Sequence, residues 1–248
     1  IVGELLSSDA DCLTADGNWT TALSIAAWGG HEEVVQALLC HGADPNDPDD
    51  NGNNPLHMAA LRGHNGVIEV LLVDEGVQVN ALNLSEESAL YSAARAGHIP
   101  SVVSLLHGGA SASTGFPYHG GVLGSSPLLR AVKLEEHSVL SVLLDCGASV
   151  TEAYDGGDSI MHLVTDHESV TMLMTYGAPT NSRNARGVTP LHVAAHAGRA
   201  SCLSTILHCD RALQDIDARG AEGLTALHLA IVQDHTPAIQ ALVSRGAR

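Results

Sequence analysis

The stretch Arg186-Gly-Val-Thr-Pro-Leu-His-Val-Ala-Ala-His-Ala-Gly-Arg199 decides the fold of this chain. Thr189 has the side chain of a helix N-cap, whose hydroxyl accepts a backbone N–H of the following turn. Pro190 then takes the first helical position, where its fixed φ helps and its missing N–H costs nothing. Gly198 lets the chain turn out of the helix. The stretch therefore predicts a short helix of mostly small residues, bounded by a cap and a glycine.

The same pattern recurs along the chain, and such a period is the signature of a repeat architecture. Successive caps are separated by between 30 residues (159 to 189) and 38 residues (88 to 126). Apolar pairs at helical spacing follow the caps, for example Val34-Val35 and Leu38-Leu39. A Gly-Ala pair closes most units. The equivalent cap positions are Thr21, Asn54, Ser88, Ser126, Ser159, Thr189 and Thr225.

These residues resemble the ankyrin repeat, a β-turn followed by two antiparallel helices. The resemblance covers nearly the whole chain and implies an all-α repeat solenoid of stacked helix-turn-helix repeats with β-turn fingers, in about seven units plus a partial N-terminal one. It also implies an elongated, curved stack in which the first helices line a concave face. We expect one domain over 1–248, divided into a partial repeat at 1–15 and repeats at 16–48, 49–82, 83–120, 121–153, 154–183, 184–219 and 220–248.

Three units depart from the regular length, one of them through a connection at 210–217 that is about three residues longer than usual and that we expect to be structural. The unit that begins at Ser159 is short between its helices, which predicts a distorted repeat. The finger at 111–125 is longer than the others and holds Phe116 and Tyr118 in a glycine-rich setting. Such a finger is either a tolerated surface insertion, because loop lengthening costs little, or a pair of aromatic anchors presented to a partner.

The composition excludes several classes of protein. A formal net charge of −17 disfavours binding to nucleic acid or to an anionic membrane. No apolar run approaches the roughly 20 residues that span a bilayer. The 5 cysteines form no Cys-x-x-Cys pair, so we expect reduced thiols and a cytoplasmic or nuclear location. Residues 1–15 look like the second half of a repeat, so we expect a monomeric segment of a longer protein.

The sequence gives little evidence of a catalytic or metal-binding site. Nucleophile-elbow and phosphate-loop motifs are missing, so the sequence predicts no enzyme and no cofactor. The run at 47–52 opens like a calcium loop, but Met58 stands where a bidentate Glu should be. Most of the 15 histidines fall at fixed register positions. The family resemblance implies that His57, His162, His192 and His228 are structural and hydrogen-bond the neighbouring turn.

The family resemblance also indicates which residues face the groove: the two positions after each Ala-Ala pair and the finger residues before each cap. Arg62, Arg95 and Lys133 then line the groove in three consecutive repeats. They either pair with carboxylates of the opposite fingers or bind a partner. The predicted partner-binding residues are Trp28, Asp50, Leu61, Arg62, Glu87, Arg95, Phe116, Tyr118, Lys133 and His196.

The sequence therefore predicts a non-enzymatic protein–protein interaction module whose partner is a protein or peptide with acidic and apolar residues. The longer protein could resemble an adaptor of the ankyrin and SOCS-box type, in which the repeats recognise a substrate. The alternative is a scaffold or spring in a channel or multidomain enzyme. A third hypothesis is hydroxylation of Asn80, whose setting is similar to sites oxidised in some ankyrin proteins.

Overall fold

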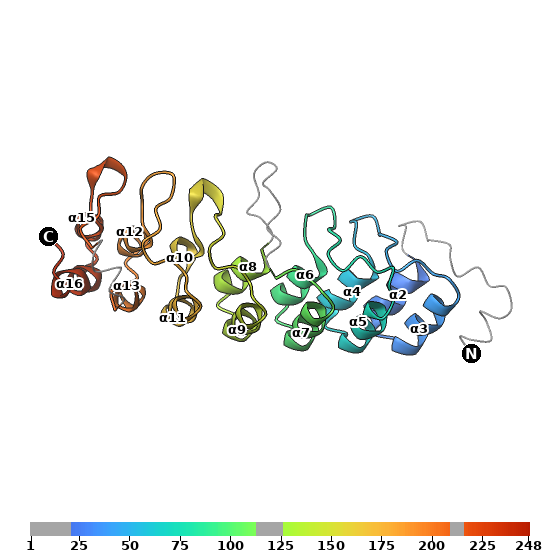
Figure 1. The fold of residues 1–248 in the computed structure, drawn as a ribbon. Helices are drawn as coiled ribbons and strands as arrows, with labels where there is room; N and C mark the ends of the chain where they lie inside the picture. The colour runs from blue at the N-terminus through green and yellow to red at the C-terminus, as the bar shows by residue number, and fades with distance from the viewer. Residues whose placement is uncertain (1–20, 113–125, 209–215) are drawn as a thin grey trace. The chain divides into compact units, whose positions relative to one another are not determined.

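The computed structural model describes residues 21–112, 126–208 and 216–248, and within these residues the chain is all helical, with no strand. The helices come in pairs, and a finger precedes the pairs that begin with α4, α6, α10, α12 and α15 (Figure 1). The first helices of the pairs are α2 (Ala22–Gly29), α4 (Pro55–Arg62), α6 (Ala89–Arg95), α8 (Pro127–Lys133), α10 (Ile160–Leu163), α12 (Pro190–His196) and α15 (Ala226–Val232). The second helices are α3 (Glu32–Cys40), α5 (Asn65–Leu72), α7 (Ile99–His107), α9 (His137–Asp145), α11 (His167–Thr175), α13 (Ala200–Ile206) and α16 (Thr236–Ser244).

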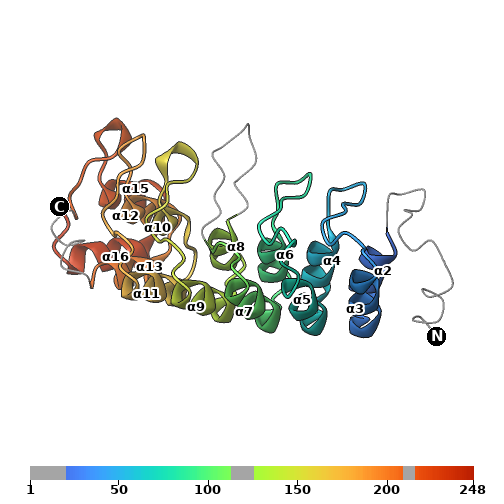
Figure 2. The same ribbon diagram turned by 45° about the vertical axis from the view of Figure 1, so that its right-hand side comes forward.

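The chain forms two compact units. The first unit holds the helices from α2 to α7 and the start of α8, and the second holds the end of α8, most of α9 and the helices from α10 to α16. Within the first unit α2, α4 and α6 lie side by side, with α3, α5 and α7 in a second row (Figures 1 and 2). The fingers of this unit all project on the side of the first helices (Figure 2).

The helices begin where the cap residues predict. Thr21, Asn54 and Ser88 have extended backbones, and each side chain accepts the N–H of the residue three positions on. Cap side chains also contact the histidine three positions on: the Thr189 hydroxyl lies 2.7 Å from Nδ1 of His192, and Oδ1 of Asn54 lies 2.6 Å from Nδ1 of His57. The cap therefore fixes the histidine ring as well as the start of the helix.

Small residues form the contact between neighbouring first helices. The alanine pairs of α2, α4 and α6 are buried, with exposed fractions between 0% and 4%. Leucines and valines of the second helices complete the core, for example Val35, Leu71 and Leu105. This packing of helix pairs explains how a chain with 3% aromatic residues still forms a continuous core within each unit.

The fingers are closed by main-chain hydrogen bonds. In the finger at 49–53 the N–H of Asp49 donates to the carbonyl of Asn53, and the finger at 83–87 is closed in the same way. Neighbouring fingers also bond to each other, since the N–H of Leu84 donates to the carbonyl of Asn51 at 2.9 Å. The fingers within each unit are thus held in a fixed order.

The unit at Ser159 is distorted, as its length predicts. Helix α10 has only 4 residues, whereas α12 and α15 have 7 each. Val164 ends α10 with an extended backbone at ψ 141°. Within the described residues, no helix is long and apolar enough to cross a membrane.

Candidate functional site

The face of the first unit that carries the first helices and fingers is the strongest candidate for a binding surface. We call it the finger-side face, formed by the exposed residues of α2, α4 and α6 and by the fingers at 49–53 and 83–87. Each first helix buries its alanine pair and then turns its next residues outward, so that Trp28 is 42% exposed. The residues at the ends of these short helices are therefore not needed for packing between helices, and they can be large side chains that face solvent.

Trp28 and Arg62 form the central contact of this face. The guanidinium carbon of Arg62 lies 4.7 Å from the centroid of the Trp28 ring. Such a cation–π contact is worth about 0.5–1 kcal/mol at an exposed site. Both side chains stay exposed, and Leu61 beside them is half-buried. The pair presents a flat aromatic surface with a positive charge on it.

Arg95 on the next first helix has a different partner. Its guanidinium lies 3.9 Å from a carboxylate oxygen of Glu87, and the two side chains are 38% and 19% exposed. An ion pair of this length and exposure contributes about 0–1 kcal/mol. Arg95 therefore keeps most of its capacity to bind an outside anion, although Glu87 competes for it.

The positive charge of the first unit is concentrated on this face. Arg62 and Arg95 are the only lysine or arginine residues between positions 21 and 112. The second helices of the unit carry acidic side chains instead, namely Glu32, Glu33 and Glu69. The two cations thus stand together in an otherwise acidic part of the chain.

The other predicted binding residues are more scattered. Asp50 is exposed at the tip of its finger. Lys133, at the exposed end of α8, belongs to the second unit and not to the unit of Arg62 and Arg95. Phe116 and Tyr118 lie outside the described residues.

His196 lies in a hollow of the second unit, which we call the finger hollow. It has a volume of about 460 Å³ and opens among the last three fingers and the helices α12 and α15. Its apolar lining consists of half-buried valine and leucine side chains. The lining residues are Asp158, Asn184, Arg186, Val188, His192, Val193, His196, Glu222, Leu224 and Leu229.

The histidines at the third position of the first helices join neighbouring repeats. Nε2 of His57 donates to the carbonyl of Glu87 at 3.0 Å, and Nε2 of His162 donates to the carbonyl of Val188 at 3.0 Å. His192 reaches the carbonyl of Leu224 at 3.2 Å. Each acceptor is the last residue before the next cap, so these rings hold the base of the following finger.

These contacts agree with the comparisons to known proteins. A family model described as ankyrin repeats (3 copies) matches residues 1–83 and 159–248, which is more than half of the chain. The chain belongs to the ankyrin repeat family.

Among curated ankyrin-containing relatives, the chicken (Gallus gallus) nuclear factor NF-kappa-B p105 subunit is 30% identical over 131 residues, covering 50% of this chain and 13% of that protein. Human ankyrin repeat and SOCS box protein 3 is 32% identical over 100 residues, covering 39% of this chain and 19% of that protein. The chain thus spans less than a fifth of the length of either relative.

Two solved ankyrin repeat domains share the fold. The domain of Bcl-3, described as a member of the IkappaB protein family, has a TM-score of 0.69 at 25% identity and covers 77% of this chain and 85% of its own. The domain of human ASB11 has a TM-score of 0.71 at 24% identity and covers 92% of this chain and 99% of its own. The matching family is a family of protein–protein interaction modules.

The acidic finger that resembles a calcium loop uses its oxygens to build the ankyrin finger. Oδ1 of Asp49 accepts the backbone N–H groups of Asn51 and Asn53 at 2.9 and 2.8 Å. In the described part of the chain, no group of three or more His, Cys, Asp or Glu residues is placed to hold a metal ion. Asn80, the residue proposed for hydroxylation, bridges to the next repeat: its amide donates to the carbonyl of Gly109 and accepts the N–H of Ser111.

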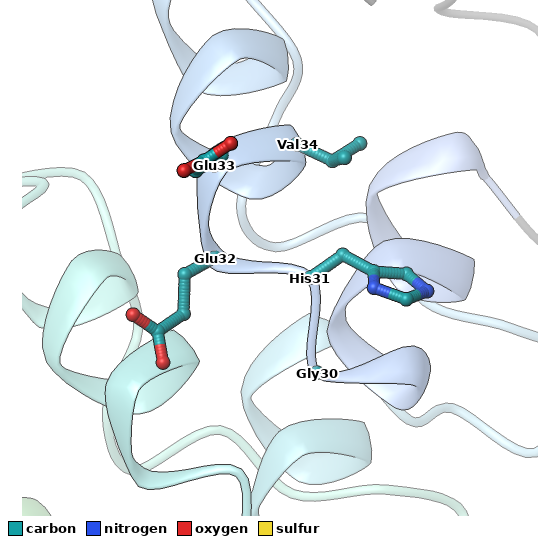
Figure 3. Close-up of a pocket in the computed structure, with 5 residues that line it drawn as sticks. All are labelled: Gly30, His31, Glu32, Glu33 and Val34. Carbon is teal, nitrogen blue, oxygen red and sulfur yellow. The ribbon is translucent and has the colours of Figure 1, made fainter.

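A smaller hollow of about 340 Å³ lies where α2 turns into α3 (Figure 3). Gly30, His31, Glu32, Glu33 and Val34 line it. The Glu32 side chain points toward α5, and the His31 ring points toward α2 (Figure 3). Two carboxylates in the first turn of α3 are the usual complement of a helix N-terminus. Their presence is therefore explained by the helix itself.

The sequence did not predict all the contacts of the residues on the finger-side face. One of its two alternatives paired the basic residues with finger carboxylates, which holds for Arg95, whereas Arg62 lies over Trp28. Sequence reasoning also missed the apolar lining of the finger hollow, for example Val188 and Leu224. The signal was the apolar residue that precedes the caps Thr189 and Thr225, since finger ends are otherwise polar.

Proposed function

We propose that the protein is a non-enzymatic interaction module that binds a partner through the finger-side face of its first unit. The partner is a protein or peptide segment in which an acidic side chain stands next to an apolar one. The observation that carries this proposal is the Trp28–Arg62 contact, because both side chains stay exposed instead of being used up in packing.

The chemistry of the face supports this class of partner. Tryptophan and arginine are enriched at binding hot spots. Arg62 and Arg95 give the face two positive charges, and half-buried Leu61 together with Ile25, which is 56% exposed, adds apolar area. An acidic side chain would pair with a guanidinium while its apolar neighbour covers the indole ring. Asp50 and Glu87 would repel partners that carry acidic groups in the wrong register.

The relatives suggest a setting for such a module. By its name, one relative combines ankyrin repeats with a SOCS box, and we propose that this chain likewise serves as the recognition or adaptor segment of a longer protein. The free cysteines Cys40, Cys146 and Cys202 support a reducing compartment, the cytoplasm or the nucleus.

The alternative is a scaffold or spring role within a channel. Human transient receptor potential cation channel subfamily A member 1 is 29% identical over 100 residues, covering 39% of this chain and 9% of that protein. In a spring the exposed residues of the finger-side face would have no preferred partner, so the binding experiment below separates the two functions.

The experiment is a selection of random displayed peptides on the immobilised protein, followed by affinity measurements with the best peptide. We expect the selected peptides to place Asp or Glu beside Leu, Ile, Phe or Trp. The double variant Arg62→Glu, Arg95→Glu should weaken binding at least about tenfold, because hot-spot contacts are lost and like charges face each other. Trp28→Ala should weaken binding similarly.

The matched control is the double variant Arg186→Glu, Arg248→Glu, which changes the net charge by the same amount but lies in the second unit. It should bind as the parent does. Equal losses in both double variants would mean that only the net charge matters. A selection that enriches no acidic-apolar peptide would contradict the proposal. Lys133→Glu in the same assay tests whether this residue also takes part.

A further inference from the structure

The repeat of α10 and α11 departs from the other repeats at the residue that precedes its second helix. In four repeats a histidine stands 10 residues after the cap and precedes the second helix, as His64 follows Asn54 (64 − 54 = 10). In the short repeat this place falls to Asp166, only 7 residues after Ser159 (166 − 159 = 7), and Asp166 is the N-cap of α11. A carboxylate therefore stands where four of the other repeats have an imidazole.

The lost turn of α10 exposes two carbonyl groups that side chains of α13 and its cap take up. The guanidinium of Arg199 donates to the carbonyl of Val164 at 2.9 Å, and the thiol of Cys202 donates to the carbonyl of Thr165 at 3.4 Å. Burial raises the pKa of the Cys202 thiol, which keeps it a donor. The short repeat is thus well attached to the repeat that follows it.

The attachment to the preceding repeat depends on His137, the first residue of α9. Nε2 of His137 lies 3.0 Å from Oδ1 of Asp166, and Nδ1 lies 3.4 Å from Oε2 of Glu168. The Thr165 hydroxyl adds a hydrogen bond of 3.1 Å to Glu135. These three polar contacts join the start of α11 and the two residues before it to the first residue of α9 and the turn before it.

We propose that His137 is a proton-dependent latch that holds the α10–α11 repeat to the preceding repeat when its ring is protonated and loosens it when the ring is neutral. A neutral imidazole carries one N–H, whereas the imidazolium carries two. Both ring nitrogens face carboxylate oxygens, so only the imidazolium donates to both. On loss of the proton, one carboxylate faces a lone pair instead of a donor.

The charged groups around His137 favour the latched state. Glu135 and Glu136 precede it on its own turn, Asp166, His167 and Glu168 face it from the start of α11, and Arg199 lies beyond Val164. Burial by itself would raise the pKa of Asp166, but hydrogen bonds from Ser169 and His137 outweigh burial and hold that pKa below its usual range. Asp166 therefore stays ionised in the pH range in which histidine titrates, between pH 5 and 8.

The latch has a direction with pH. With an imidazolium ring and an ionised Asp166 the junction is closed, because both ring nitrogens donate to carboxylates. With a neutral ring one of the two carboxylates has no donor, and the junction loosens. The short repeat carries Asp158 on the wall of the finger hollow, so loosening it would also alter that hollow. This inference does not depend on the proposed binding by the first unit.

Hydrogen exchange of the whole protein tests the latch, read by mass spectrometry over 160–175. The parent and the variant His137→Gln are compared at the same pH, so that the intrinsic chemistry of exchange cancels. At pH 5.5 we expect the variant to exchange about fivefold faster over this segment, in line with the loss of ionic contacts. At pH 8.5 the two proteins should differ little.

Asp166→Asn is the second variant, because asparagine keeps the N-cap of α11 but removes the charge. It should reproduce the pH dependence of His137→Gln. The control is His64→Gln read over 65–72, since Nε2 of His64 bonds to the neutral carbonyl of Trp28 at 2.9 Å and this change should act alike at both pH values. Equal effects of His137→Gln at both pH values, or none at either, would overturn the latch.

Discussion

Replacing Gly30 with alanine is expected to lower the free energy of unfolding by about 3 kcal/mol, combining backbone strain with overpacking. Gly30 ends α2 at φ +75°, a left-handed conformation that costs other residues about 1 kcal/mol or more. An added Cβ would also stand 2.7 Å from Nδ1 of His64. The ring cannot move without cost, because its Nε2 is bonded to the carbonyl of Trp28 at 2.9 Å.

Gly42→Ala is the matched control for this prediction. Gly42 follows α3 at φ +87°, but an added Cβ there meets nothing within 4 Å. It should cost only the conformational strain, about 1 kcal/mol. Urea unfolding monitored by circular dichroism measures both variants. If the two substitutions cost the same, the close approach of His64 to Gly30 contributes nothing to stability.

Replacing His192 with leucine is expected to cost about 2 kcal/mol at pH 7.5, because the carbonyl of Leu224 loses its donor in a half-buried place. Leucine is a natural choice, since Leu129 occupies the same register position in another repeat. At pH 5 the difference in stability between parent and variant should be smaller. Urea unfolding at the two pH values measures this difference.

The sign follows from the pKa of His192, which burial lowers from the ordinary histidine value of 6.5. Its Nδ1 accepts the backbone N–H of Thr189 at 3.3 Å, so the native site favours the neutral ring. The unfolded chain therefore binds a proton more readily, and the histidine's contribution is full above pH 6.5 and is lost as the pH falls toward the lowered value.

A titratable side chain is required for this effect, and Leu191→Ala provides the control. Leu191 is 4% exposed in the same helix, and its loss should cost the same at both pH values. A His192→Leu difference that stays constant, or that widens on acidification, would contradict the neutral bridging role of the ring.

The candidate site was only partly predictable from the residues. The positions of Trp28, Arg62 and Arg95 followed from the resemblance to the ankyrin repeat, which implies that the two residues after each alanine pair face the groove. Their partners did not follow. Whether Arg62 contacts Asp50 or Trp28 depends on side-chain rotamers and on the spacing of α2 and α4, which no one-dimensional pattern encodes.

The same limit applies to the short repeat. Its missing residues were visible in the distance from Ser159 to Asp166, and a distorted repeat was expected there. That Arg199 and Cys202 fill the gap on one side and His137 on the other required the coordinates. These contacts join residues 29 to 37 positions apart.

The sequence by itself determined the family, the order of the helices and where each first helix begins, because these features rest on local rules that recur with the period of the chain. Caps, proline at the first position and left-handed glycines act within a few residues. Only the tertiary structure decided how Trp28 and Arg62 combine, which side chains line the finger hollow and how the short repeat is held. Those features depend on contacts between side chains of different repeats. The interaction energy of each contact depends on the distance between the side chains and on their burial, and the repeat pattern specifies neither.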